Sequence, residues 1–175
     1  MHSTLIPGQQ VPDLSVPLVG GDQFTLNANA PENFTAIIFY RGLHCPICRG
    51  QLSDFNGKAD DFSAIGIDVV AVSMDSEERA SQTRDDWRLD KLTLGYGMDE
   101  ATARAWGLYM SDAIKDNEPA VFSEPGLAIV RPSGQLYHWS LQTAPFGRAK
   151  AADLAGVLKF VIENDYPVRG QRLAG

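Results

Sequence analysis

Cysteine is scarce in this sequence, and no long apolar run occurs in it. The 175 residues include two cysteines and three histidines, and no apolar stretch approaches the length that crosses a bilayer. Two cysteines cannot form a disulfide scaffold. Even with the histidines, which lack a His-x-x-x-His spacing, they do not supply an evident four-ligand zinc site. We therefore expect no metal, no cofactor and no membrane span.

Basic residues are outnumbered as well, with 15 Lys and Arg against 22 Asp and Glu and a net charge of −7. This balance disfavours nucleic acid and anionic membranes as partners. The first residues lack the basic segment and apolar core of a secretion signal. We find no repeat and no Ser/Gly-rich linker, and 44% of the residues are hydrophobic. The expectation is a cytoplasmic protein with a single domain over residues 1–175.

The two cysteines stand three apart, in Cys45-Pro46-Ile47-Cys48, just after the apolar run Phe34–Tyr40. Apolar residues recur at helical spacing from Pro46 to about Ala64, and proline suits the first turn of a helix. A cysteine at a helix N-terminus has a stabilised thiolate. The pattern predicts a redox site in which Cys45 is the nucleophile and Cys48 resolves the oxidised form.

Other interpretations of the pair are a half zinc site and a structural disulfide. The first lacks partner ligands, and the second closes too small a loop to stabilise the fold much. Arg41 and His44 precede Cys45 and can add positive charge beside it. Either can equally be a solvated surface residue. If His44 lies next to the thiol, the reactivity of the thiol should depend on pH between about 5 and 8.

The rest of the chain alternates strand and helix patterns, which indicates an α/β fold. An N-terminal β-hairpin is expected first, and a C-terminal hairpin and helix close the chain. Segment 107–125 is the least regular, and its polar run 111–119 is either a spacer or a mobile cover; we favour the spacer. The predicted strands are 34–40, 67–74 and 92–96, the hairpins 11–26 and 126–141, and the helices 46–64, 76–88, 99–106 and 149–163.

This order of elements resembles the thioredoxin fold, with a central mixed sheet flanked by helices and the N-terminal hairpin as an extension. More closely, the chain resembles peroxiredoxin-like members of the alkyl hydroperoxide reductase and thiol-specific antioxidant (AhpC/TSA) family. The resemblance rests on Pro7-Gly8, Pro12-Asp13-Leu14, Gly21-x-x-Phe24-x-Leu26, Phe39-Tyr40-Arg41-Gly42 before Cys45-Pro46, Val72–Ser76 with Trp87, Ala105–Leu108 and Pro132–Leu136.

The chain also departs from that family. A threonine that positions the peroxide usually stands three residues before the reactive cysteine, where this chain has Gly42. An arginine usually precedes the fourth strand, where this chain has Phe122-Ser-Glu-Pro125. The resemblance therefore leaves Arg41 and Arg148 as candidate cations, each with a solvated surface role as the alternative. The short loop and the second cysteine are more like thioredoxin.

The resemblance also implies substrate-binding positions. In such folds a cis-proline before the fourth strand lies beside the cysteines, and Pro125, flanked by Glu124, fits that place. We expect a cis bond there, and count Gly42, Glu124, Pro125 and Arg148 as substrate-binding candidates. Glu124 either tunes the thiols or faces water.

The function that follows is a thiol-dependent oxidoreductase that reduces peroxides or protein disulfides. A thioredoxin- or glutaredoxin-type protein would return the electrons, and a homodimer is compatible with the family. The alternative is a redox-sensing or partner-binding module without efficient turnover.

Overall fold

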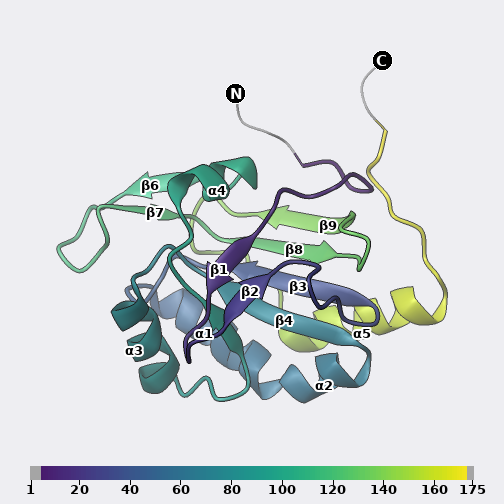
Figure 1. Ribbon diagram of the computed structural model, residues 1–175, viewed down its shortest axis with the longest axis horizontal. Helices are drawn as coiled ribbons and strands as arrows, with labels where there is room; N and C mark the ends of the chain where they lie inside the picture. Colours follow the sequence, from purple (N-terminus) through teal and green to yellow (C-terminus); the bar gives the residue numbers. More distant parts are fainter. Residues whose placement is uncertain (1–4, 173–175) are drawn as a thin grey trace.

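A mixed five-stranded sheet forms the centre of the protein in the computed structural model, which describes residues 5–172 (Figure 1). Its strand order is β5-β4-β3-β8-β9. The first three strands are parallel, whereas β8 runs antiparallel to β3 and β9 antiparallel to β8. The strands are β3 (Phe34–Phe39), β4 (Ile67–Val72), β5 (Thr93–Gly95), β8 (Gly126–Val130) and β9 (Leu136–Leu141).

Apolar residues place β3 at the centre of the sheet, because all six of its residues are buried. One core lies between the sheet and α1 (Pro46–Gly57), α2 (Ala59–Ala64), α3 (Glu77–Trp87) and α5 (Ala151–Glu163). A second core joins the other face to α4 (Glu100–Ala105), Trp106 and the N-terminal segment. The predicted α/β architecture, a mixed sheet flanked by helices, is confirmed.

The N-terminal hairpin forms as predicted, from β1 (Ser15–Pro17) and β2 (Gln23–Thr25). It makes a sheet of its own and meets the edge of the central sheet through a single bridge, between Leu18 and Gly95. Side-chain caps begin two helices where the sequence placed them. Ser76 accepts from the N–H of Arg79, and Asp99 accepts from that of Thr102.

Two details differ from the expectation. The helix expected over 46–64 is interrupted at Lys58, next to Gly57, which is a poor helix former. The run 111–119 is only partly a loop, because Ser111 and Asp112 belong to β6 (Met110–Asp112) and pair with β7 (Val121–Ser123). Strand pairing depends on the partner strand as well as on local composition, and β6 is mixed in polarity. Within residues 5–172 no helix combines the length and apolarity needed to span a membrane.

Candidate active site

The two cysteines lie at the junction of β3 and α1, as predicted. Cys45 is the N-cap residue of α1, with extended backbone angles, and Pro46 occupies the first turn. The backbone N–H of Cys48 donates to Cys45 Sγ over 3.3 Å. Both are free thiols, 2.8 Å apart, and they are 1% and 0% exposed. The helix therefore presents its N-terminal amides to the first sulfur, which favours a thiolate there.

The electrostatics separate the two sulfurs. The pKa of Cys45 is lowered to about 6, chiefly by a hydrogen bond from the Cys48 side chain and, against the cost of burial, by the Cys48 N–H, Arg148 and Arg41. The pKa of Cys48 is raised well above its ordinary value, first by burial and then by Cys45. At neutral pH the pair therefore carries a thiolate on Cys45 and a thiol on Cys48.

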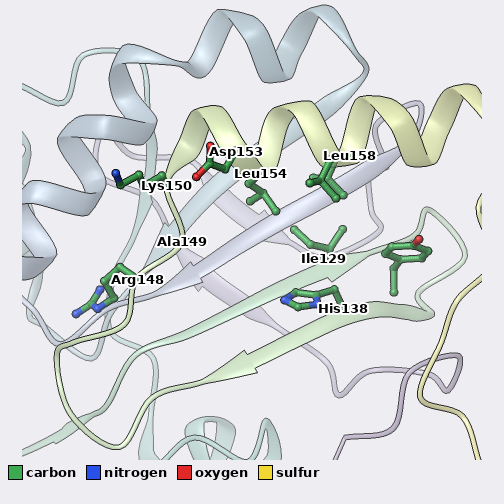
Figure 2. A pocket seen from close by; sticks show the side chains of 10 residues that line it. Ile129, His138, Arg148, Ala149, Lys150, Asp153, Leu154 and Leu158 are labelled. Atoms are coloured by element: carbon green, nitrogen blue, oxygen red, sulfur yellow. The ribbon is translucent and has the colours of Figure 1, made fainter.

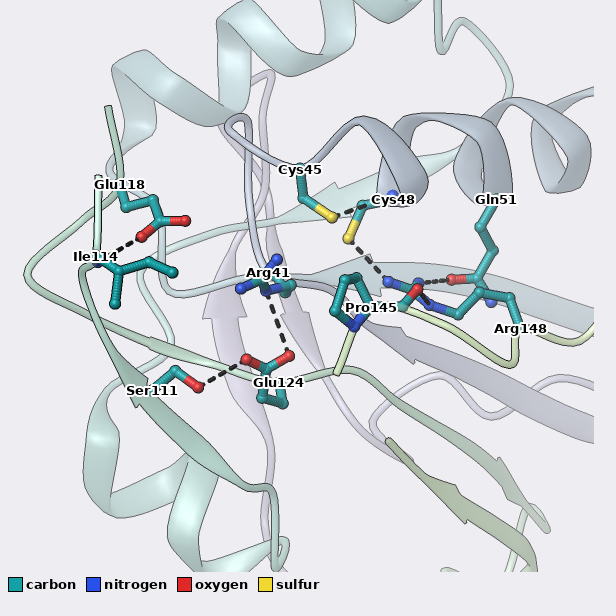
Figure 3. A network of polar contacts seen from close by, with 10 residues as sticks. All are labelled: Arg41, Cys45, Cys48, Gln51, Ser111, Ile114, Glu118, Glu124, Pro145 and Arg148. Atoms are coloured by element: carbon teal, nitrogen blue, oxygen red, sulfur yellow. Dashed lines mark hydrogen bonds and ion pairs between the residues drawn. The ribbon is translucent and has the colours of Figure 1, made fainter. Parts of the chain in front are cut away.

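Arg148 reaches the cysteines from the loop before α5 (Figure 3). Its Nη2 atom donates to Cys48 Sγ over 3.2 Å, and its Nε donates to the carbonyl of Pro145 over 2.8 Å. Its Nη1 donates to the side chain of Gln51, on α1. Pro145 and Gln51 thus hold the guanidinium against the buried sulfur, although the arginine is 100 residues from Cys48 in the sequence.

Arg41 lies on the other side of Cys45 and pairs with Glu124. Its Nε atom is 3.3 Å from Glu124 Oε2, and Ser111 Oγ donates to the other oxygen of that carboxylate over 2.7 Å (Figure 3). The Arg41 guanidinium also lies 4.7 Å from the centre of the Phe122 ring. Glu124 is 3% exposed, so it balances Arg41 inside the protein and does not face water.

His44 packs edge-on against the same Phe122 ring, with the ring centres 4.7 Å apart. Neither ring nitrogen of His44 has a hydrogen-bond partner among the described residues. Burial, followed by the positive charge of Arg41, lowers the pKa of His44. The surroundings of His44 therefore favour the neutral imidazole.

The prediction of a cis bond at Pro125 is wrong, because every peptide bond within residues 5–172 is trans. Trans is the lower-energy isomer before proline unless packing forces the other. Here the chain on both sides is already fixed with a trans bond. The N–H of Glu124 donates to the carbonyl of Tyr109, and the Pro125 carbonyl accepts from the N–H of Gln142. Pro125 still lies near Arg148, since both line a small cavity with Gln51.

Asp75 is a residue of the site that the sequence analysis missed. It follows β4 and is 2% exposed. One carboxylate oxygen accepts from the N–H of Leu43 over 2.8 Å, and the other accepts from Arg79 Nε over 2.9 Å. Gly42 lies against it with φ +129°, and a Cβ there would approach the Asp75 oxygens to 2.7 and 2.8 Å. Asp75 therefore fixes the loop between β3 and Cys45.

A positional signal for Asp75 was available in the sequence. β3 and β4 are parallel neighbours, so the residues that follow them meet at one edge of the sheet. No comparable signal pointed to three other residues of the site. Phe122 comes from β7, Gln51 from a later turn of α1, and Pro145 from the loop before α5.

The loop between β6 and β7 lies on the Arg41 side of the site. Glu118 accepts from the backbone N–H groups of Ile114 and Lys115, which closes the loop on itself (Figure 3). The Asn117 carbonyl accepts from Arg79 Nη2 over 3.4 Å. Since Arg79 also holds Asp75, this loop is tied to the loop that carries the cysteines.

Within residues 5–172 no group of three or more His, Cys, Asp or Glu side chains is placed to hold a metal.

Comparison with known proteins identifies the family. Residues 7–139 match the AhpC/TSA family. The chain belongs to the AhpC/TSA family. A Mycobacterium tuberculosis protein assigned as a peroxiredoxin, Rv2521, is 30% identical over 105 residues, which are 60% of this chain and 66% of that protein. The match thus covers slightly less than two thirds of this relative.

Solved structures agree on the fold. AhpC from Mycobacterium tuberculosis superposes with a TM-score of 0.75 at 16% identity. The match covers 97% of this chain and 100% of the AhpC chain. Reduced Prx3 from Vibrio vulnificus, in complex with hydrogen peroxide, superposes with a TM-score of 0.74 at 14% identity. This match covers 89% of this chain and 99% of the Prx3 chain. The predicted thioredoxin-like, peroxiredoxin-like architecture is confirmed. The class of enzyme expected from the sequence, a thiol-dependent oxidoreductase, is that of this family.

Proposed function

We propose that this AhpC/TSA family member reduces peroxides through Cys45 and Cys48. The observation that carries the proposal is the buried thiolate. Cys45 has a pKa lowered to about 6, yet it is only 1% exposed. A small peroxide can enter such a site, whereas a protein disulfide needs an accessible sulfur. The peroxide bound by the related Prx3 structure supports the same substrate class.

In the first step the Cys45 thiolate attacks one oxygen of the peroxide. An S–O bond forms as the O–O bond breaks, and the other oxygen takes up a proton and leaves as water or an alcohol. Cys45 becomes a sulfenic acid. Arg148 and Arg41 both lower the pKa of this sulfur, so both are placed to stabilise the charge that moves.

In the second step Cys48 attacks the sulfenic sulfur. The S–S bond forms, the S–O bond breaks, and water leaves. Before oxidation the Cys45 charge helps to raise the pKa of Cys48, and that repulsion disappears once Cys45 is a sulfenic acid. Arg148, at 3.2 Å, then stabilises the Cys48 thiolate. A thioredoxin- or glutaredoxin-type dithiol would return two electrons and two protons by exchange.

The test uses the reduced protein and hydrogen peroxide in rapid mixing. Cys45→Ser should abolish peroxide consumption. Cys48→Ser should consume one equivalent and then accumulate a sulfenic acid, which dimedone traps as a mass increase. The opposite pattern, with turnover in Cys45→Ser, contradicts the assignment of the two roles.

A thiol-disulfide reductase is the second candidate, and the position of the pair at the start of α1 favours it. The family threonine is replaced by Gly42, whose packing against Asp75 leaves no room for a side chain. Fast exchange with a small disulfide and a slow reaction with peroxide would select this function. Slow reactions with both would select the sensor. The homodimer stays a prediction, which light scattering of the purified protein can check.

A further inference from the structure

An apolar groove lies between α5 and the strands β8 and β9, and neither proposed redox step uses it (Figure 2). Its volume is about 450 Å³, within the range of small-molecule sites. Leu154, Val157 and Leu158 of α5 form one wall, and Ile129 lies on the floor. Val157 is 58% exposed, so the helix leaves a large aliphatic side chain at the opening. A concave apolar lining of this size is the usual setting of a small-molecule site.

An irregularity in the sheet closes the far end of the groove. The register of β8 and β9 shifts between Ile129 and Val130, which leaves Tyr137 without a partner in the ladder. Tyr137 therefore lines the groove together with its neighbour His138. The hydroxyl of Tyr137 donates to the carbonyl of Tyr166 over 3.3 Å, which holds the ring in place.

The near end of the groove is polar and carries charges of both signs. Arg148, Lys150 and Asp153 gather where α5 begins (Figure 2). Lys150 makes no ion pair within residues 5–172, and the guanidinium of Arg148 meets no carboxylate in the same part of the chain. The first N–H of the helix, that of Ala151, already donates to the Asp54 carboxylate over 2.8 Å, so the cationic character of this end comes from side chains and not from the helix dipole. Because Arg148 is held by Cys48, Gln51 and Pro145, Lys150 is the cation that is left for an anion at this end.

We propose that the groove binds a single-chain alkyl carboxylate. Its hydrocarbon chain lies against Leu154, Val157 and Ile129, and its carboxylate lies near Lys150. The distance along the helix from Lys150 to Leu158 is about 12 Å at 1.5 Å per residue. This length suits a chain of medium size, such as decanoate. The ligand is bound and not transformed, so the proposal is independent of the peroxide chemistry.

Isothermal titration of the reduced full chain with hexanoate, octanoate and decanoate, each below its micelle concentration, tests the proposal. Affinity should rise with chain length, by up to about fourfold per methylene if each is fully buried. Decanol should bind more weakly than decanoate because it lacks the charge. Nuclear magnetic resonance shifts should concentrate in α5 and β9. Equal affinity along the series, or no saturable binding, contradicts the proposal.

Two variants separate the two ends of the ligand. Lys150→Met keeps the aliphatic stem but removes the charge, so it should weaken decanoate at least fivefold and leave decanol unchanged. Val157→Asp places a carboxylate at the apolar wall and should abolish binding of both. Ile114→Asp is the matched control, because it makes the same charge change at a side chain that is 84% exposed outside the groove.

Binding of decanoate that survives Val157→Asp, or that Ile114→Asp removes equally, overturns the assignment to this groove. A vesicle arm distinguishes a free carboxylate from a lipid surface. Binding to phosphatidylglycerol vesicles without binding to monomeric decanoate would overturn the proposal in favour of a membrane-facing surface. Circular dichroism of each variant checks that a loss of binding is not a loss of fold.

Discussion

At the scale of single residues, the site is defined by which charges each sulfur meets. Cys45 accepts a hydrogen bond from a backbone N–H, and the guanidiniums of Arg148 and Arg41 lower its pKa. Cys48 is more deeply buried and contacts only Arg148 of these two. The motif by itself does not distinguish the two thiols. Arg148 is the residue that connects them, since it lowers the pKa of both.

Arg148→Met should therefore act on both steps of the proposed reaction. The rate of reaction of wild type with hydrogen peroxide should rise as pH increases through about 6, the pKa of Cys45, because only the thiolate attacks. In Arg148→Met the midpoint should move to higher pH and the sulfenic acid should live longer. Stopped-flow tryptophan fluorescence over pH 5–9 measures both effects. Arg169→Met, at an exposed position, should change neither.

Asp75 acts through the loop and not on the sulfur, so its effect has a distinct signature. Asp75→Asn leaves one of its two donors, Leu43 N–H or Arg79 Nε, facing an amide N–H group. We expect the peroxide rate to fall about tenfold to hundredfold through misplacement of Cys45. The midpoint of its pH profile should stay near 6, since Asp75 is not among the causes of that pKa.

Asp68→Asn is the control for this variant, because Asp68 is an exposed carboxylate on β4, the strand that precedes Asp75. A large shift in the pH midpoint of Asp75→Asn would show that the residue acts on the thiol directly and not by positioning the loop.

At the scale of elements, the helix α1 and the loop before it have opposite requirements for glycine. Gly42 has a φ of +129° and faces Asp75, whereas Gly50 lies within α1, where an added Cβ would meet nothing within 4 Å outside the helix backbone. The first glycine is required by backbone conformation and close packing. The second stands in the interior of a helix, where glycine makes the folded protein less stable than alanine would.

Alanine substitutions at the two glycines should have effects of opposite sign. Gly42→Ala should lower the free energy of unfolding by about 1–3 kcal/mol through backbone strain and contact with Asp75. Gly50→Ala should raise it by about 0.5–1 kcal/mol. Urea unfolding of the reduced proteins measures both. A neutral Gly42→Ala would contradict the requirement for glycine at this position.

Several elements could be predicted because their signals are local. The apolar run of β3 and the starts of α3 and α4 at Ser76 and Asp99 all lie where the sequence indicated. The strand β6 was missed because its partner stands about ten residues away and its own residues are mixed in polarity. The trans bond at Pro125 was missed because a family pattern outweighed the ordinary preference of the peptide bond.

At the scale of the whole molecule, the thiolate is linked to stability. A folded pKa of about 6 for Cys45 lies below the ordinary thiol value, so the folded state favours the deprotonated form. Its contribution is fully present above the unfolded pKa and is lost as pH falls through 6. Between pH 5 and pH 7 this amounts to about 1.4 kcal/mol in favour of the reduced folded protein.

The difference in unfolding free energy between reduced wild type and Cys45→Ser should therefore increase from pH 5 to pH 7. Chemical denaturation at fixed ionic strength measures it at each pH. A difference that stays constant would mean that Cys45 is protonated in the folded protein, and the proposed nucleophile would lose its main support.

Local chemistry in the sequence alone determined the α/β alternation, the central strand, and the placement of Cys45 and Cys48 at a helix start. These features depend on residues close together in the chain, where propensity and apolar spacing decide the outcome. Only the tertiary structure decided which charged groups meet the sulfurs. Arg148, Glu124 and Asp75 arrive from separate elements, and the packing of the sheet and helices sets their distances. The groove along α5 is likewise a product of packing, because its lining comes from β8, β9 and α5, which are far apart in the sequence or on different elements.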